Sequence, residues 1–142
     1  MVKYHEKTIK GVQGLSTVSI VKCDSYDDKK VMQAVMESFR NLGGVEKFIK
    51  PGMKVALKAN LLMDKPPSSA VTTHPAVVKA VSALAREAGA SVLIIDSPGG
   101  QYSKGLLKRI YSACGIEEAA RETGAELNFD LSQCEVDNPL GK

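Results

Sequence analysis

Hydrophobic positions along the chain follow two periods, one typical of strands and one typical of helices. Apolar or alternating stretches of strand length lie at residues 17–23, 53–58, 91–96 and 125–129. The stretch at 91–96 is the clearest, because its four consecutive apolar residues are expected where both faces of a strand are covered. The sequence therefore predicts four short strands.

Amphipathic helices are predicted between these strands. After the first strand, apolar residues recur at helical spacing from Val31 to Leu42, and a glycine pair ends the pattern. A second helix opens at Pro75, since proline is favoured at the first helical position. Two further helices follow the third strand, one around residues 106–111 and a shorter one over residues 115–123.

Strands that alternate with amphipathic helices at this spacing indicate βαβ units. We therefore expect an α/β domain with three layers, α/β/α, and a mostly parallel sheet covered by helices on both faces. The domain is expected to span residues 17–130. Residues 1–16 predict a polar amino-terminal arm, and residues 131–142, which show no period, predict a tail or a linker into a second half outside this chain.

Composition narrows the class of protein. The chain has 142 residues with 44% apolar and 25% charged positions, which suits one compact domain. A net charge of +3, 5% aromatic residues and no tryptophan argue against nucleic-acid binding. No apolar run approaches the ~20 residues of a membrane span. Three cysteines without a C-x-x-C spacing predict reduced thiols in a cytoplasmic setting.

Polar residues follow the predicted strands at 53–58 and 91–96. In an open α/β sheet, ligands bind beyond the carboxyl ends of the strands. An acid at that position can ligate a metal or move a proton, and a helix start favours an anion. We expect His74 and Asp96 to be the catalytic residues. The remaining site residues, expected to bind an anionic substrate, are Lys58, Asn60, Thr72, Thr73, Ser97, Gly99 and Gly100.

Each of these residues also has an ordinary structural interpretation. Asp96 can cap the following turn, Thr73 can cap the second helix, and Lys58 can be a solvated surface residue. Asp24, Asp27 and Asp28 are expected to cap the first helix. The class of ligand, whether a metal or a small anion such as phosphate or carboxylate, stays open at this stage.

Several motifs, taken in order, resemble domain-of-unknown-function family 362 (DUF362). They are the stretches at residues 48–55, 57–62 and 95–100 and the sequence Thr72-Thr73-His74-Pro75. The resemblance runs from about residue 17 to residue 130. Ala59 departs from the proline that is usual in the K-P-N triplet of the family, but the side chains of Lys58 and Asn60 are retained.

The resemblance also implies a larger protein. Members of the family are about twice this length or more, so the chain is expected to be an amino-terminal portion. The family implies an iron–sulfur-associated redox setting and an oxidoreductase of which this chain would be part. Any iron–sulfur cluster is expected in a later, carboxy-terminal part, because the C-x-x-C-x-x-C ligands are missing here. The alternative is a non-enzymatic interaction or scaffold domain, which would form homo-oligomers through surface exposed by truncation.

Overall fold

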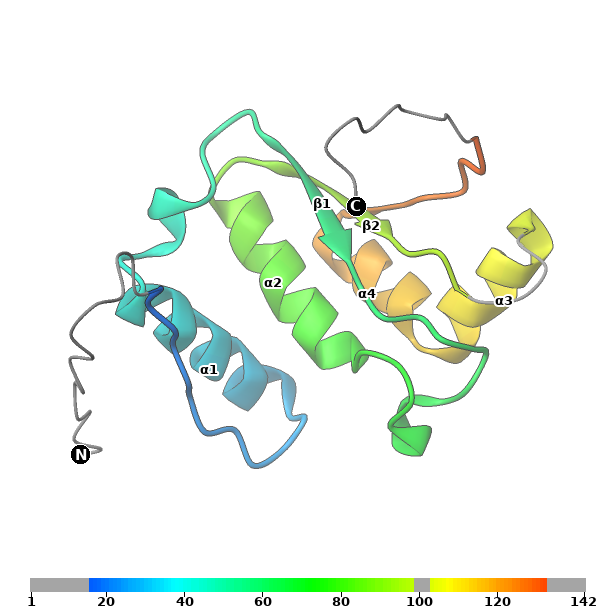
Figure 1. The fold of residues 1–142 in the computed structure, drawn as a ribbon, viewed down its shortest axis with the longest axis horizontal. Coiled ribbons are helices and arrows are strands. Elements are labelled where there is room, and N and C mark those ends of the chain that lie inside the picture. The colour runs from blue at the N-terminus through cyan, green and yellow to red at the C-terminus, as the bar shows by residue number, and fades with distance from the viewer. Residues whose placement is uncertain (1–15, 99–102, 133–142) are drawn as a thin grey trace, which may run out of the picture.

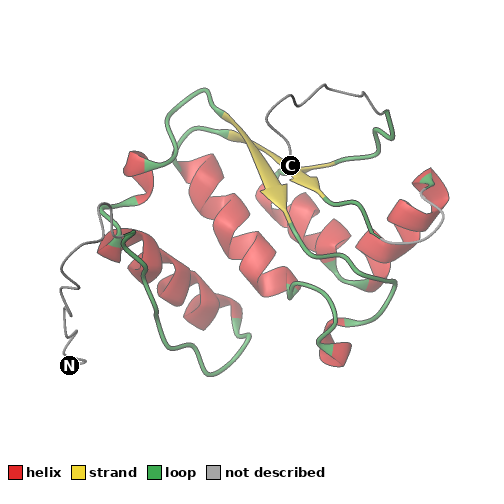
Figure 2. Cartoon of the chain, in the orientation of Figure 1, coloured by secondary structure: helices red, strands yellow, loops and turns green. Residues whose placement is uncertain are grey.

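The structure, a computed structural model, describes residues 16–98 and 103–132 (Figure 1). Its helices and strands are α1 (Asp28–Asn41), β1 (Lys54–Lys58), α2 (Pro75–Glu87), β2 (Ser91–Ile95), α3 (Lys104–Ala113), α4 (Ile116–Thr123) and β3 (Glu126–Leu127), with short 3-10 turns η1 (Val45–Lys47) and η2 (Pro67–Ser69). Figure 2 shows how helices and strands alternate along the chain.

The sheet has three parallel strands in the order β1-β2-β3. β1 and β2 pair along their full length, with Lys58 opposite Ile95 at the carboxyl end. β3 is short and pairs with the middle of β2, where Ile94 lies opposite Leu127. The predicted α/β class and the parallel sheet are confirmed, because parallel neighbours require the helical crossovers that the sequence pattern indicates.

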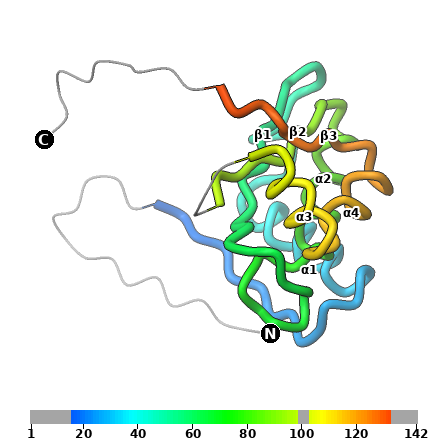
Figure 3. Tube along the Cα trace, turned by 90° about the vertical axis from the view of Figure 1, so that its right-hand side faces the viewer, coloured from blue at the N-terminus to red at the C-terminus, as the bar shows by residue number. Residues whose placement is uncertain are grey.

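α2 and α4 pack against one face of this sheet, and α1 packs against α2. α1, α2 and α4 lie on the same side of the strands (Figures 1 and 3), and α3 packs against α4. Val92 and Ile94 of β2 are buried on this face, whereas Ser91 and Leu93 are more accessible. Two successive right-handed crossovers that step in the same direction put their helices on the same face. The second helical layer expected from the sequence is therefore not formed by the residues that the structure describes.

The main core joins the covered face of the sheet to α3 and α4. Its largest fully buried side chains include Leu61, Ile94, Leu107, Ile110, Tyr111 and Ile116. The hydroxyl of Tyr111 donates to the carbonyl of Asn128 at 3.1 Å, which satisfies its polar end in the core. A second, smaller cluster joins α1 to α2 and consists of Val31, Ala76 and Ala80.

The strand predicted at residues 17–23 is wrong. This segment is extended but belongs to no sheet of the described residues, and it lies beside α1 (Figure 1). The amide of Asn41 donates to the hydroxyl of Ser19 at 3.2 Å. Alternation indicates which side chains face inward, and a strand also needs a neighbour with which to form a ladder. The predicted fourth strand, at residues 125–129, is confirmed only over Glu126–Leu127.

Candidate functional site

The site predicted at the carboxyl ends of the strands is centred on Asp96. Asp96 follows β2 directly and is only 5% exposed. Its Oδ1 accepts from the Nζ of Lys58 at 2.5 Å, and its Oδ2 accepts from the backbone N–H of Leu61 at 2.7 Å. Lys58 ends β1, so the parallel register brings the two residues to the same edge of the sheet. The two oxygens of the carboxylate therefore each have a donor.

Electrostatics keep Asp96 ionised. Burial raises the pKa of Asp96, but this effect is outweighed by the donors around it: Lys58, the backbone of Leu61 and the backbone of Ser97. The net result is a pKa below the ordinary value for an aspartate. Lys58 contrasts with its partner, because its side chain is 72% exposed. Its ammonium group has three donors, so further donors remain available to solvent or to a ligand.

The segment after β1 is tied to the start of α2. The backbone N–H of Asn60 donates to the hydroxyl of Thr73 at 2.9 Å, and the N–H of Thr73 donates back to the carbonyl of Asn60 at 2.8 Å. The N–H of Ala59 donates to the carbonyl of Ile95 at 3.2 Å, which continues the β1–β2 pairing. These bonds hold the amino end of α2 next to the strand ends that carry Lys58 and Asp96.

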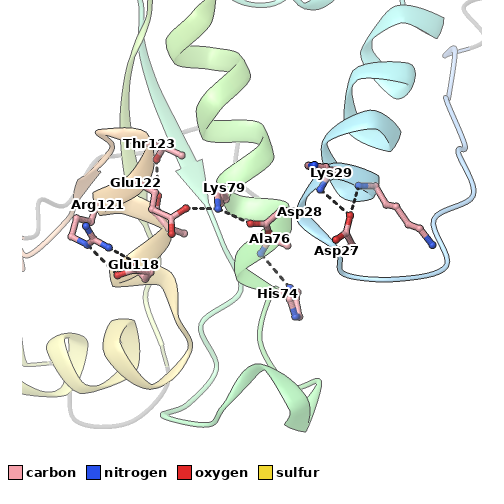
Figure 4. Close-up of polar contacts among 12 residues, drawn as sticks. Asp27, Asp28, Lys29, His74, Ala76, Lys79, Glu118, Arg121, Glu122 and Thr123 are labelled. Atoms are coloured by element: carbon pink, nitrogen blue, oxygen red, sulfur yellow. Dashed lines mark hydrogen bonds and ion pairs between the residues drawn. The ribbon is translucent and has the colours of Figure 1, made fainter.

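His74 has a structural role that the sequence did not reveal. It is the N-cap of α2, and its Nδ1 accepts from the backbone N–H of Ala76 at 3.2 Å (Figure 4). Its ring stacks on Tyr26, with 3.8 Å between centroids and 8° between planes. Burial lowers the pKa of His74, and the nearby charge of Asp28 opposes this only in part. The hydrogen bond to Ala76 assigns the proton of the neutral ring to Nε2.

A second polar cluster joins three helices. Lys79 of α2 pairs with Asp28 of α1 at 2.6 Å and with Glu122 of α4 (Figure 4). Hydrogen bonds from its ammonium to Asp28 and then to Glu122 raise the pKa of Lys79. These three residues were not predicted as a site, and their contacts connect neighbouring helices. Asp27 caps α1 as expected, because its carboxylate accepts from the N–H groups of Lys29 and Lys30.

The predicted site residues are only partly brought together. The structure joins Lys58 to Asp96 and Asn60 to Thr73, and Ser97 is exposed beside Asp96. Thr72 and His74 fall outside this group. The contacts of His74 are to Tyr26 and Ala76 rather than to Lys58 or Asp96. Thr72 is half-buried, and its hydroxyl has no partner among the described residues. Gly99 and Gly100 lie outside the described residues.

Two contributions to the site could not be identified from side-chain types. The N–H of Leu61 binds Asp96 through the backbone, which any residue except proline could do. Tyr26 reaches His74 from a segment 48 positions earlier in the chain, and no spacing rule connects the two. Only the folded arrangement identifies both.

The described residues do not fit an iron–sulfur cluster. They contain no group of three histidine, cysteine or acidic side chains arranged to hold a metal ion. Cys114 is buried in the core, and its thiol donates to the carbonyl of Met63 at 3.4 Å. Cys23 is exposed in the segment beside α1. These two thiols belong to different environments and do not form a ligand set.

Fold and site together define a parallel α/β domain with a polar cluster at the carboxyl ends of its strands. The chain belongs to the family described as "Domain of unknown function (DUF362)", whose sequence model matches residues 55–142. It is 35% identical over 92 residues to the Thylakoid-associated protein sll1697 of Synechocystis sp.. That match covers 65% of this chain and 29% of the relative, so the chain spans less than a third of it.

Two further findings concern solved structures and membrane-spanning helices. No solved structure matches the chain significantly. Among the residues that the structure describes, no helix combines the length and the apolar character needed to cross a bilayer. The association with thylakoids belongs to the name of that relative.

Proposed function

We propose that Lys58, Asn60, Thr73 and Asp96 form a binding site for a small anion, called here the strand-end site. The observation that carries the proposal is the contrast within one ion pair. Asp96 is 5% exposed and held by several donors, whereas the side chain of Lys58 is 72% exposed. The ammonium group of Lys58 is held on one side by the buried Asp96 and is exposed to solvent on the other. A cation placed in this way is suited to bind phosphate or carboxylate.

Charge and hydrogen bonding favour an anion over a metal ion. Both carboxylate oxygens of Asp96 already accept hydrogen bonds, from Lys58 and from Leu61. A metal ion at this carboxylate would be repelled by the Lys58 ammonium, whose Nζ lies 2.5 Å from Oδ1. The amino end of α2 adds its positive dipole at the same edge, held there by the Asn60–Thr73 bonds.

In this proposal Asp96 positions Lys58 and does not contact the ligand. His74 supports the site indirectly, because it caps the helix that directly follows Thr73. The catalytic roles expected for His74 and Asp96 from the sequence remain predictions. A proton-transfer role for His74 would require its Nε2, since Nδ1 is occupied by the N–H of Ala76.

We place the strand-end site in a longer protein that works in an iron–sulfur-associated redox setting in the cytoplasm. Support for this wider setting comes from the family resemblance and from the length of the relative, of which the match covers 29%. In that proposal any cluster ligands come from outside the described residues, which supply none. The part played by this chain is to hold an anionic group of the substrate.

The strand-end site is tested by titrating the protein with inorganic phosphate while following backbone and lysine side-chain NMR shifts. We expect shifts at Lys58, Asn60 and Thr73. The variant Lys58→Gln is expected to lose about tenfold or more in phosphate affinity, since one charge-assisted hydrogen bond contributes roughly 1.5–3 kcal/mol.

The matched control is Lys54→Gln. Lys54 begins the same strand, is exposed like Lys58, and lies at the opposite end of the sheet. Phosphate affinity should be unchanged in this variant, although its net charge is the same as that of Lys58→Gln. Equal losses in the two variants would show a non-specific charge effect and would contradict the strand-end site. An absence of any phosphate-dependent shift would favour the alternative function, an interaction domain.

A further inference from the structure

The first turn of α2 continues directly from the strand-end site, and its backbone donors are occupied by its own cap. Thr73, a member of that site, is the residue before the N-cap His74. Pro75 has no N–H, and the N–H of Ala76 donates to the Nδ1 of His74 at 3.2 Å. The next two N–H groups of the helix donate to the carbonyl of His74. Donors that a helix start can offer to an anion are therefore taken up within the chain.

The side-chain part of this cap depends on the protonation state of His74. A neutral imidazole accepts at one nitrogen and donates at the other, whereas an imidazolium donates at both. When Nδ1 carries a proton, it meets the N–H of Ala76 as a second donor, and the hydrogen bond between them is lost. Protonation therefore releases the N–H of Ala76. It also adds a positive charge at the amino end of α2, where the helix dipole is already positive.

Groups from the neighbouring helices and from the segment before α1 determine how readily His74 takes up a proton. Burial disfavours the charged ring and Asp28 of α1 favours it, with the net result that the pKa of His74 is lowered. Asp28 also pairs with Lys79 of α2, and Lys79 pairs with Glu122 of α4 (Figure 4). Tyr26 stacks on the ring at 3.8 Å, a contact that an imidazolium can keep as a cation–π interaction. The ring is thus neutral at pH 8 and becomes protonated in acidic solution.

We propose that protonation of His74 strengthens anion binding at the strand-end site. This inference rests on the proposed function and adds its regulation by pH. In the protonated chain, the anion bound by Lys58 gains the released N–H of Ala76 and the positive charge of the ring. The two hydrogen bonds between Asn60 and Thr73 connect these donors, because they hold the residue before His74 beside the end of β1.

Thermodynamic linkage makes this coupling reciprocal. If the proton on His74 raises the affinity of the chain for an anion, the bound anion raises the affinity of His74 for its proton by the same factor. The charge of the anion acts in that direction, since a nearby negative charge favours the imidazolium. The pKa of His74 should therefore be higher in the complex than in the free chain.

The test is an NMR titration of the full chain with sulfate at pH 5 and at pH 8. Sulfate is the probe because, unlike phosphate, it keeps the same charge over this range. Binding should be at least about tenfold tighter at pH 5, the effect of one charge-assisted hydrogen bond. The amide of Ala76 should shift with sulfate at pH 5 and not at pH 8. Saturating sulfate should raise the pKa of His74, which is read from its ring signals.

The variant His74→Asn separates helix capping from the proton, because asparagine caps a helix and does not titrate in this range. Its affinity for sulfate should be the same at both pH values. The matched control is His5→Asn, which makes the same exchange at the other histidine of the chain and should keep the full pH dependence. Circular dichroism at both pH values verifies that the variants remain folded.

The proposal is overturned if the unchanged chain binds sulfate equally well at both pH values, or if the pH dependence persists in His74→Asn. Loss of the pH dependence in His5→Asn would also overturn it. Failure of the proposed function gives a different result. Lys58→Gln should weaken sulfate binding at both pH values, so that an unchanged affinity in this variant would contradict the strand-end site itself, and this inference with it.

Discussion

Asp96 is the residue on which the strand-end site depends, and its environment gives it a measurable pH dependence. Its pKa in the folded chain lies below that of the unfolded chain, because the donors around it outweigh the effect of burial. A group of this kind stabilises the fold above its unfolded pKa of about 3.9. That contribution is lost as the pH falls through the lower folded pKa.

The variant Asp96→Asn should therefore be less stable at neutral pH by roughly 1.5–3 kcal/mol, the value of a charge-assisted hydrogen bond. Chemical denaturation at pH 7 and again near pH 3 measures the difference. The gap between the two proteins should narrow at low pH, since Asp96 of the unchanged chain begins to be protonated there. A gap of the same size at both pH values would show that the difference in stability does not come from the ionised form of Asp96.

His74 gives a second prediction at the scale of the residue. Its folded pKa is lowered from 6.5, so the neutral ring stabilises the fold above the unfolded pKa, and stability decreases as the pH falls from there towards the folded pKa. His74→Asn keeps a capping side chain but removes the titration. Thermal melts between pH 5 and 8 should decline at the acid end more steeply for the unchanged chain. If the melting temperatures of the two proteins changed with pH in parallel, His74 would be excluded as the source of the pH dependence.

At the scale of the element, Gly89 explains how α2 can turn directly into β2. Its φ of +84° lies in the left-handed region, and its carbonyl accepts from the N–H of Gly52 at 2.8 Å. A Cβ at this position would lie 3.2 Å from atoms of Pro51. The helix end and the turn before β1 are thus in direct contact, which sets the start of the β1–β2 pairing.

Gly89→Ala should destabilise the chain by more than the roughly 1–2 kcal/mol expected for a left-handed alanine alone. Gly52→Ala is the matched control. Gly52 has a similar φ of +80°, but a Cβ there would have no neighbour within 4 Å. Denaturant midpoints of the two variants separate backbone strain from the contact with Pro51. Equal midpoints would mean that Pro51 moves away without cost.

The starts of helices were predicted correctly where residues close in the sequence determine them. α2 begins at Pro75 and α1 is capped by Asp27, and both features follow from nearby side chains and backbone groups. The segment at residues 17–23 shows the limit of this reasoning. Its alternation correctly indicates which side chains face inward, but a ladder needs a second strand, and the described residues supply none beside it.

At the scale of the whole molecule, the described residues leave one face of the sheet without a helical layer. In the strand order β1-β2-β3, β1 is an edge strand. Helices α2 and α4 pack on one face of the sheet, and no described helix packs on the other face. Purely parallel sheets in α/β proteins are normally covered on both faces. Additional residues of a longer family protein would have room to pack on the face without a helical layer.

The sequence by itself determined the α/β class, the parallel sheet, and the position of Lys58 and Asp96 at one edge. These follow from periodicity and from the rule that parallel strands end together. Only the tertiary structure decided that both carboxylate oxygens of Asp96 accept hydrogen bonds, that the ring of His74 stacks on Tyr26, and that α2 and α4 lie on the same face of the sheet. Those outcomes depend on contacts between residues far apart in the chain, about which local patterns carry no information.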